Sequence, residues 1–159
     1  MSSRLRHLWL AIVTLPGLLF SLRRRALFRE MRSFSRSLPA VLKAPLPDAL
    51  QQLTPLPQPA ALSERDIRNL ADLVALLDRR SPLGLCLRRS LTRYHFLRRA
   101  GIPVVLRFGA KFVNGKADRD IAGHAWLTLN GAPYYESGEN WQGFSVMLSF
   151  PEENGKIKT

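Results

Sequence analysis

The chain reads SPLGLCLRRSLTRYHFLRRAGIPVVLRFGAKF over residues 81–112 and GHAWLTLNGAPYYE over residues 123–136. The apolar residues at the start of this sequence recur at helical spacing: Leu83, Leu87, Leu91 and Tyr94. Proline is tolerated in the first turn of a helix, and glycine commonly follows the last turn. We therefore expect a helix from Ser81-Pro82 to Gly101.

The hydrophobic period changes after this helix. From Pro103 to Phe112 apolar residues stand at every second position, which predicts a β-strand. Asn114-Gly115 marks a turn after that strand.

Three more strands are expected after this turn. One runs over His124–Leu129 and ends at Asn130-Gly131, a dipeptide typical of tight hairpins. The next passes through Tyr134 and Tyr135, and the last covers Phe144–Phe150. Helices followed by an antiparallel sheet predict an α+β fold.

Another helix is expected upstream of these elements. Ser63 can cap its start, and Glu64 and Asp66 place negative charge in its first turn. Apolar residues recur at helical spacing as far as Leu77, so the helix should end near Arg80. The folded domain is therefore expected over residues 63–151, with residues 152–159 as a tail.

The chain before Ser63 divides into two segments. Residues 1–43 hold nine arginine and lysine residues against Glu30 alone, and so contribute +8 to a net charge of +12. This basic, partly apolar segment is expected to be helical. Six of the 11 prolines crowd into residues 39–59, which predicts a proline-rich linker without regular helix over residues 44–62.

An apolar run extends from Leu8 to Leu22. A membrane-spanning helix needs about 20 apolar residues, and Pro16-Gly17 interrupts this shorter run. Arg23-Arg24-Arg25 occupies the place where a signal peptide would be cleaved. We expect a kinked helix or helical hairpin that either packs on the domain or lies on an anionic membrane surface, and both alternatives stay open.

The single cysteine limits the chemistry. It excludes an internal disulfide framework, and one cysteine with three scattered histidines is too few for a structural zinc site. No metal and no cofactor is expected. A reducing cytoplasm is the expected compartment, with membrane association through the N-terminal segment as an additional hypothesis.

Cys86 stands near the start of the helix that follows Ser81-Pro82. Unpaired backbone N–H groups at a helix start favour a thiolate, and Arg88 and Arg89 add positive potential nearby. His124 begins a strand, and a histidine facing a cysteine activates the thiol for acyl transfer. The backbone N–H of Cys86 would help to stabilise the oxyanion. Each residue taken alone is more often structural than catalytic.

A carboxylate should orient His124, and Glu136, Glu139 and Asp120 are the candidates. If Asn130-Gly131 forms a strict two-residue turn, Glu136 points to the face opposite the histidine. A three-residue loop would instead place Glu136 on the face of His124, so the catalytic interpretation requires a loop with an odd number of residues. Alternatively, Glu136 and Glu139 are solvated loop carboxylates.

The sequence from about Ser81 to Pro151 resembles the leader peptidases of lasso-peptide biosynthesis, which belong to the transglutaminase-like superfamily. The most specific parts of the resemblance are three spaced blocks: Cys86 followed by Arg89-Ser90-Leu91, then Leu97 to Pro103, and then His124-Ala125-Trp126-Leu127.

The resemblance implies a papain/transglutaminase-like fold, with Cys86 as nucleophile, His124 as base and Glu136 as third member of the triad. The family usually has an aspartate at this third position, whereas this chain has a glutamate. The implied reaction is proteolytic removal of the leader from a ribosomally made precursor peptide. The implied partners are that precursor, a separate leader-recognition protein and an ATP-dependent macrolactam cyclase.

Two alternative functions stand beside this one. Another transglutaminase-like acyl transferase would use Cys86 and His124 with an amine in place of water. A basic, non-catalytic protein that binds an anionic membrane or nucleic acid would use the arginines instead. The segment Arg23–Arg36 interleaves only Phe28 and Phe34 with its basic residues, so we expect no nucleic acid partner.

Overall fold

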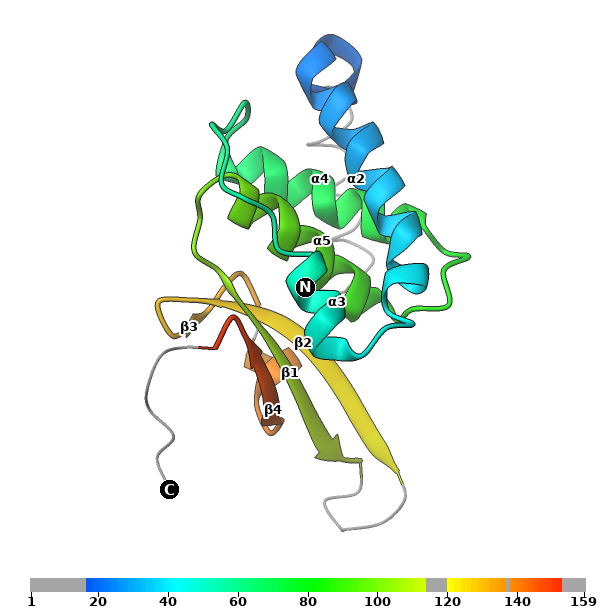
Figure 1. Ribbon diagram of the computed structural model, residues 1–159, viewed down its shortest axis with the longest axis vertical. Helices are drawn as coiled ribbons and strands as arrows, with labels where there is room; N and C mark the ends of the chain where they lie inside the picture. Colours follow the sequence, from blue (N-terminus) through cyan, green and yellow to red (C-terminus); the bar gives the residue numbers. More distant parts are fainter. Residues whose placement is uncertain (1–16, 114–119, 137, 153–159) are drawn as a thin grey trace. The chain divides into compact units, whose positions relative to one another are not determined.

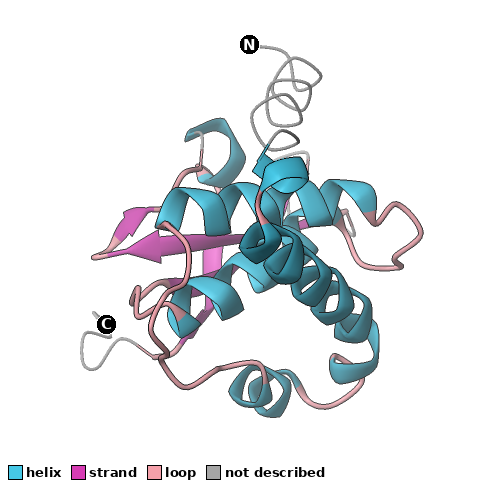
Figure 2. Ribbon diagram, turned by 90° about the horizontal axis from the view of Figure 1, so that it is seen from above, coloured by secondary structure: helices cyan, strands magenta, loops and turns pink. Residues whose placement is uncertain are grey.

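The computed structural model describes residues 17–113, 120–136 and 138–152. The chain divides into two compact units, Met1–Ile102 and Pro103–Thr159. Among the described residues, the first unit contains helices and the second contains the sheet (Figures 1 and 2). These elements confirm the predicted α+β class.

Within residues 17–102, the first unit contains the helices α2 (Leu22–Val41), α3 (Leu46–Gln52), α4 (Glu64–Leu77) and α5 (Leu85–Arg99), and residues 17–20 are also helical. Helix α4 packs against both α2 and α5. Large side chains that are almost fully buried form the core of this unit: Met31, Leu38, Leu50, Leu70, Val74, Leu91, Tyr94, Phe96 and Leu97.

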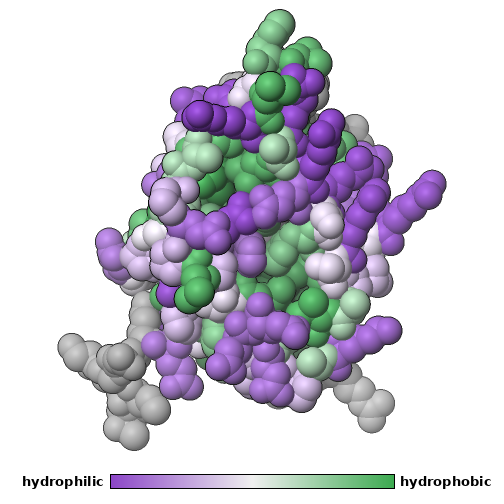
Figure 3. All heavy atoms as spheres, turned by 45° about the horizontal axis from the view of Figure 1, so that its top comes forward, coloured by the Kyte–Doolittle hydropathy of each residue, from purple (hydrophilic) through white to green (hydrophobic). Residues whose placement is uncertain are grey.

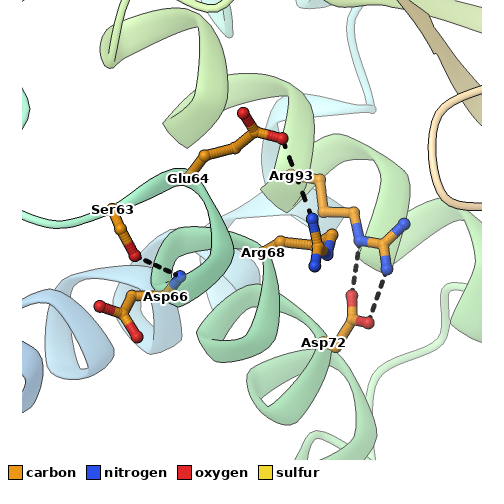
Figure 4. Close-up of polar contacts among 6 residues, drawn as sticks. All are labelled: Ser63, Glu64, Asp66, Arg68, Asp72 and Arg93. Atoms are coloured by element: carbon orange, nitrogen blue, oxygen red, sulfur yellow. Dashed lines mark hydrogen bonds and ion pairs between the residues drawn. The ribbon is translucent and has the colours of Figure 1, made fainter.

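Helix α4 forms as its sequence predicts. The Ser63 hydroxyl accepts a hydrogen bond of 3.2 Å from the backbone N–H of Asp66, which caps the helix (Figure 4). The helix ends at Leu77, three residues before the expected end at Arg80. Asp78 leaves the helical conformation there, and its carboxylate accepts a hydrogen bond of 3.4 Å from Ser35 on α2.

Helix α5 begins at Leu85, so the predicted start at Ser81-Pro82 is wrong. A local turn explains the difference, because the Ser81 hydroxyl accepts a hydrogen bond of 3.3 Å from the backbone N–H of Leu83. Gly84 then serves as the N-cap. The expected glycine signal at the other end is confirmed, because Gly101 has φ of +83° just beyond the helix.

The expectation of a linker without regular helix is wrong for Leu46–Gln52, which forms α3. Pro45 is the N-cap of this helix and Pro47 lies in its first turn, where proline removes no intrahelical hydrogen bond. Burial of Ala49 and Leu50 stabilises the helix. Residues 54–60 have no regular secondary structure, as expected.

The second unit contains a four-stranded antiparallel sheet. The strands are β1 (Val105–Phe112), β2 (Ile121–Leu129), β3 (Ala132–Pro133) and β4 (Ser145–Phe150), with the order β3-β2-β1-β4. A short helix, α6 (Gly138–Trp141), lies between β3 and β4. The expected turn at Asn114-Gly115 lies outside the described residues.

The third strand is shorter than predicted. Asn130 and Gly131 have φ of 52° and 79° and form a two-residue turn, after which Leu129 pairs with Ala132. The strand ends at Pro133, so its predicted continuation through Tyr134 and Tyr135 is wrong. Tyr135 has φ of 51°, a left-handed conformation that ends regular pairing.

Candidate functional site

Cys86 is the second residue of α5 and is half-buried. It lies in the first helical turn, where the backbone N–H groups have no partner within the helix and carry the positive end of its dipole. Gly84 lies next to the thiol, since a Cβ at that position would be 3.9 Å from the Cys86 sulfur. The predicted place of Cys86 at a helix start is thus confirmed.

Arg88 holds the turn that leads into Cys86. Its side chain is buried, and Nη2 donates a hydrogen bond of 3.0 Å to the backbone carbonyl of Ala75 on α4. Nη1 donates to the carbonyl of Leu83, which precedes the N-cap of α5. One guanidinium group therefore connects the last part of α4 to the backbone just before the cysteine.

His124 lies on β2 of the second unit, where an aromatic cluster fixes its imidazole ring. The ring stacks on Trp126 with a centroid distance of 5.8 Å and an interplanar angle of 15°. Its centroid is also 5.4 Å from that of Phe144, which directly precedes β4. The Nε2 atom of His124 is shielded from solvent. These contacts limit the orientations open to the ring.

Gly109 makes room for this cluster. It pairs with His124 in the register of β1 and β2. A Cβ at Gly109 would lie 2.8 Å from two ring carbons of Trp126 and 3.0 Å from the Cβ of Phe144. The backbone of β1 is therefore in such close contact with the aromatic side chains that only glycine fits without displacement.

Two basic residues share the face of His124, because Arg107, Gly109 and Lys111 alternate along β1. The Arg107 guanidinium donates to the hydroxyl groups of Thr128 on β2, at 3.4 Å, and Ser149 on β4. The Lys111 ammonium lies 4.4 Å from the centroid of the Phe144 ring, within the range of a cation–π contact. Lys111 thus contacts the aromatic cluster of the histidine, whereas Arg107 contacts hydroxyl groups of the two neighbouring strands.

Among the three candidate carboxylates, Glu136 is half-buried and lies three residues after the end of β3. Asp120 is exposed and precedes β2, where its carbonyl accepts a hydrogen bond of 2.9 Å from the N–H of Val113. Glu139 belongs to α6, but its side chain lies outside the described part of the chain.

Of the two loop lengths considered for Asn130-Gly131, the structure has the strict two-residue turn, and the odd-numbered loop that the catalytic interpretation required does not form there. The length of this turn does not decide the orientation of Glu136, because the backbone between the turn and Glu136 is irregular. Regular pairing ends before Glu136, and the left-handed Tyr135 interrupts the alternation of faces on which the argument depended. The assignment of Glu136 therefore stays a prediction.

Comparison with known protein families gives a match to the transglutaminase-like superfamily over residues 21–149. The chain belongs to the transglutaminase-like superfamily. Domains of this superfamily are often cysteine peptidases or acyltransferases. Cys86, His124 and Glu136 all lie inside the matched range, and the match also includes α2 and α3. Comparisons with curated proteins and with solved structures found no match.

The transglutaminase-like domain holds site residues that sequence reasoning did not single out. These residues are Gly109 and Phe144, which contact the aromatic cluster of His124. Arg88 was expected only to add positive potential near Cys86, whereas its guanidinium also holds the turn before that residue. A glycine inside an alternating strand pattern is a signal of close backbone approach, so Gly109 could have been noticed. Phe144 carries no comparable signal in a single sequence.

The described residues of this transglutaminase-like domain contain no group of three or more His, Cys, Asp or Glu side chains that could hold a metal ion. The described part of the chain also has no helix that is both long and apolar enough to span a bilayer.

Proposed function

We propose that this transglutaminase-like protein is a cysteine peptidase that removes the leader from a lasso-type precursor peptide. The observation that carries the proposal is the position of the only cysteine in the first turn of α5, inside the region matched to the superfamily. The resemblance of three sequence blocks to lasso leader peptidases supports the narrower assignment.

The proposed reaction starts with proton transfer from the Cys86 thiol to the His124 imidazole. The thiolate attacks the carbonyl carbon of the last leader residue, and the backbone N–H of Cys86 donates to the resulting oxyanion. When the tetrahedral intermediate collapses, the C–N bond breaks and the imidazolium protonates the leaving amine. The core peptide leaves with a free amino terminus, and the leader stays attached to Cys86 as a thioester.

Water then attacks the thioester while His124 accepts its proton. The leader is released with a carboxylate, and the thiol is restored. Both steps require the Cys86 sulfur and the His124 imidazole to lie within hydrogen-bond reach, as the proposed papain/transglutaminase-like fold implies. We propose Glu136 as the carboxylate that holds the imidazole in the productive orientation.

Hydrolysis by this mechanism uses no metal and no cofactor. We propose three partners: the precursor peptide, a separate protein that recognises its leader, and an ATP-dependent cyclase that uses the freed amino terminus to form the macrolactam. A reducing cytoplasm is the proposed compartment, because the reaction depends on a free thiol.

Incubation of the purified full chain with a precursor peptide and its recognition protein tests the proposal. Mass spectrometry should find two fragments whose masses together equal the precursor plus one water. Cys86→Ala should abolish cleavage while it leaves the melting temperature close to that of the wild type. A conjugate between the peptide and an added amine would instead indicate the alternative acyl transferase. Undiminished cleavage by Cys86→Ala would contradict both functions.

A further inference from the structure

Helix α2 presents a row of arginines on one face: Arg25, Arg29, Arg32 and Arg36. All four side chains are exposed. At 3.6 residues per turn they lie within an arc of about 60° and extend along about 16 Å of the helix. We name these four residues the arginine row.

The arginine row faces away from the core of its unit, since Met31, Ser35 and Leu38 on the other side of α2 are buried. Among the described residues, none of its guanidinium groups forms an ion pair. Two neighbouring charged side chains are engaged elsewhere, because Arg24 binds Asp66 at 2.8 Å and Glu30 binds Arg99. The row is therefore a concentrated, uncompensated positive surface.

An exposed apolar group lies at the N-terminal end of the arginine row. Leu19, Phe20 and Leu22 have exposed fractions of 70%, 88% and 76%. Leu22 continues the face of the row at the start of α2, and Figure 3 shows apolar atoms projecting beside hydrophilic ones at this end of the helix. We name these three residues the apolar tip.

We infer that the arginine row and the apolar tip together form a docking surface for an anionic phospholipid membrane. Arginines are attracted to phosphate and to the negative surface potential of the bilayer, while aliphatic and aromatic side chains enter the boundary between headgroups and acyl chains. A purely acidic partner would explain the charge but would leave the apolar tip without a role.

A nucleic acid fits this surface less well than a membrane. Aromatic residues that stack on bases should lie among the arginines. Phe28 and Phe34 are half-buried instead, and the ring of Phe34 packs on His95 at 4.3 Å. Of the three aromatic residues Phe20, Phe28 and Phe34, only Phe20, at the end of the row, is strongly exposed.

Sedimentation of the full chain with vesicles tests the inference. Vesicles that contain phosphatidylglycerol should bind the protein, whereas vesicles of phosphatidylcholine alone should bind it at least tenfold more weakly. Replacement of all four residues of the arginine row by Gln should weaken binding to the anionic vesicles by more than about tenfold. Replacement of Leu19, Phe20 and Leu22 by Ser should also weaken binding, by about tenfold.

A matched control removes the same number of charges elsewhere in the first unit, through Gln substitutions at four exposed positions: Lys43, Arg65, Arg79 and Arg80. This variant should bind the vesicles within about threefold of the wild type. An equal loss in both charge variants would overturn the inference, because net charge alone would then explain binding.

An acidic peptide surface is the other occupant to be tested. If polyglutamate binds as tightly as the anionic vesicles, and substitution of the apolar tip changes neither affinity, the surface serves a peptide and the membrane inference is wrong. Cys86→Ala should bind vesicles like the wild type. Loss of peptidase function and loss of membrane binding are therefore distinguishable.

Discussion

Gly109 lies so close to the indole of Trp126 that a Cβ atom at this position would be only 2.8 Å from two of its ring carbons. Trp126 stacks on His124, and His124 pairs with Gly109 across the two central strands. The identity of a residue without a side chain thus controls the position of the proposed catalytic base.

Gly109→Ala should therefore damage the site more than the fold. The added Cβ would lie 2.8 Å from the Trp126 ring, so the indole and the stacked imidazole must shift. We expect a loss of about 1–3 kcal/mol in the free energy of unfolding and a fall in cleavage rate of about a hundredfold. Gly123→Ala is the control, because a Cβ there meets nothing within 4 Å and both properties should stay near wild type.

The third member of the site can be assigned by removing one carboxylate at a time. Glu136→Gln should lower the cleavage rate by about a hundredfold or more, because the imidazole loses the negative charge that orients it and stabilises its protonated form. Asp120→Asn and Glu139→Gln should retain most of the activity. A loss confined to one of the latter two variants would assign the role to that residue and exclude Glu136.

Helices α4 and α5 are joined by a bidentate ion pair, in which Nε and Nη2 of Arg93 bind the two carboxylate oxygens of Asp72 at 2.6 Å each (Figure 4). The Arg93 side chain is only 5% exposed. Asp72→Asn would remove the negative charge that both nitrogens of this buried guanidinium bind, so we expect a loss of about 3 kcal/mol in the free energy of unfolding, measured by denaturant titration.

The control for Asp72→Asn is Glu64→Gln, which removes the longer contact of 3.9 Å between Glu64 and Arg68. The Glu64 side chain is 42% exposed, so its ion pair contributes little to stability. The loss in the free energy of unfolding should therefore stay below about 0.5 kcal/mol. Equal losses in both variants would show that the buried pair is no more important than the surface pair.

Stability should fall as the pH is lowered from about 7 to 5, because burial holds the pKa of His95 below its ordinary value of 6.5. The hydrogen bond of 2.8 Å between its ring Nδ1 and the Leu53 carbonyl opposes that effect only in part. The unfolded chain binds a proton as the pH falls through about 6.5, whereas the folded chain does so only at lower pH. The free energy of unfolding therefore decreases in this window.

His95→Gln should flatten this pH dependence, since glutamine does not titrate and its amide can still donate to the Leu53 carbonyl. The measurement is the melting temperature of both proteins at several pH values between 5 and 7.5. An equal slope for the two proteins would mean that His95 does not cause the dependence.

The sequence predicted the parts of the fold that depend on periodicity and capping. Ser63 caps α4 as expected, and the change of period after Gly101 marks the change from helices to strands. The predictions failed where a local contact or an unusual backbone angle decides the outcome. Helix α3 forms despite its prolines because they occupy its first positions, and Tyr135 ends the third strand with a left-handed conformation.

For the candidate site, too, the sequence predicted some features and not others. Cys86 lies in the first turn of a helix as predicted, although that helix begins at Leu85. His124 lies on a strand as predicted, but β2 begins at Ile121, so the prediction that His124 begins the strand is wrong. The packing of Phe144 and Trp126 around the imidazole depends on contacts between strands, which a single sequence does not specify. The direction of Glu136 depends on the irregular backbone after Pro133 and could not be derived from a turn length.

The most direct test of the central claim, that His124 activates Cys86, is the rate at which iodoacetamide alkylates the folded protein. Cys86 is the only cysteine, so the mass increase reports on this thiol alone. We predict that at pH 7 His124→Gln lowers the rate by about tenfold, while Gly123→Ala leaves it unchanged. The same alkylation rate in the wild type and in His124→Gln would contradict the account.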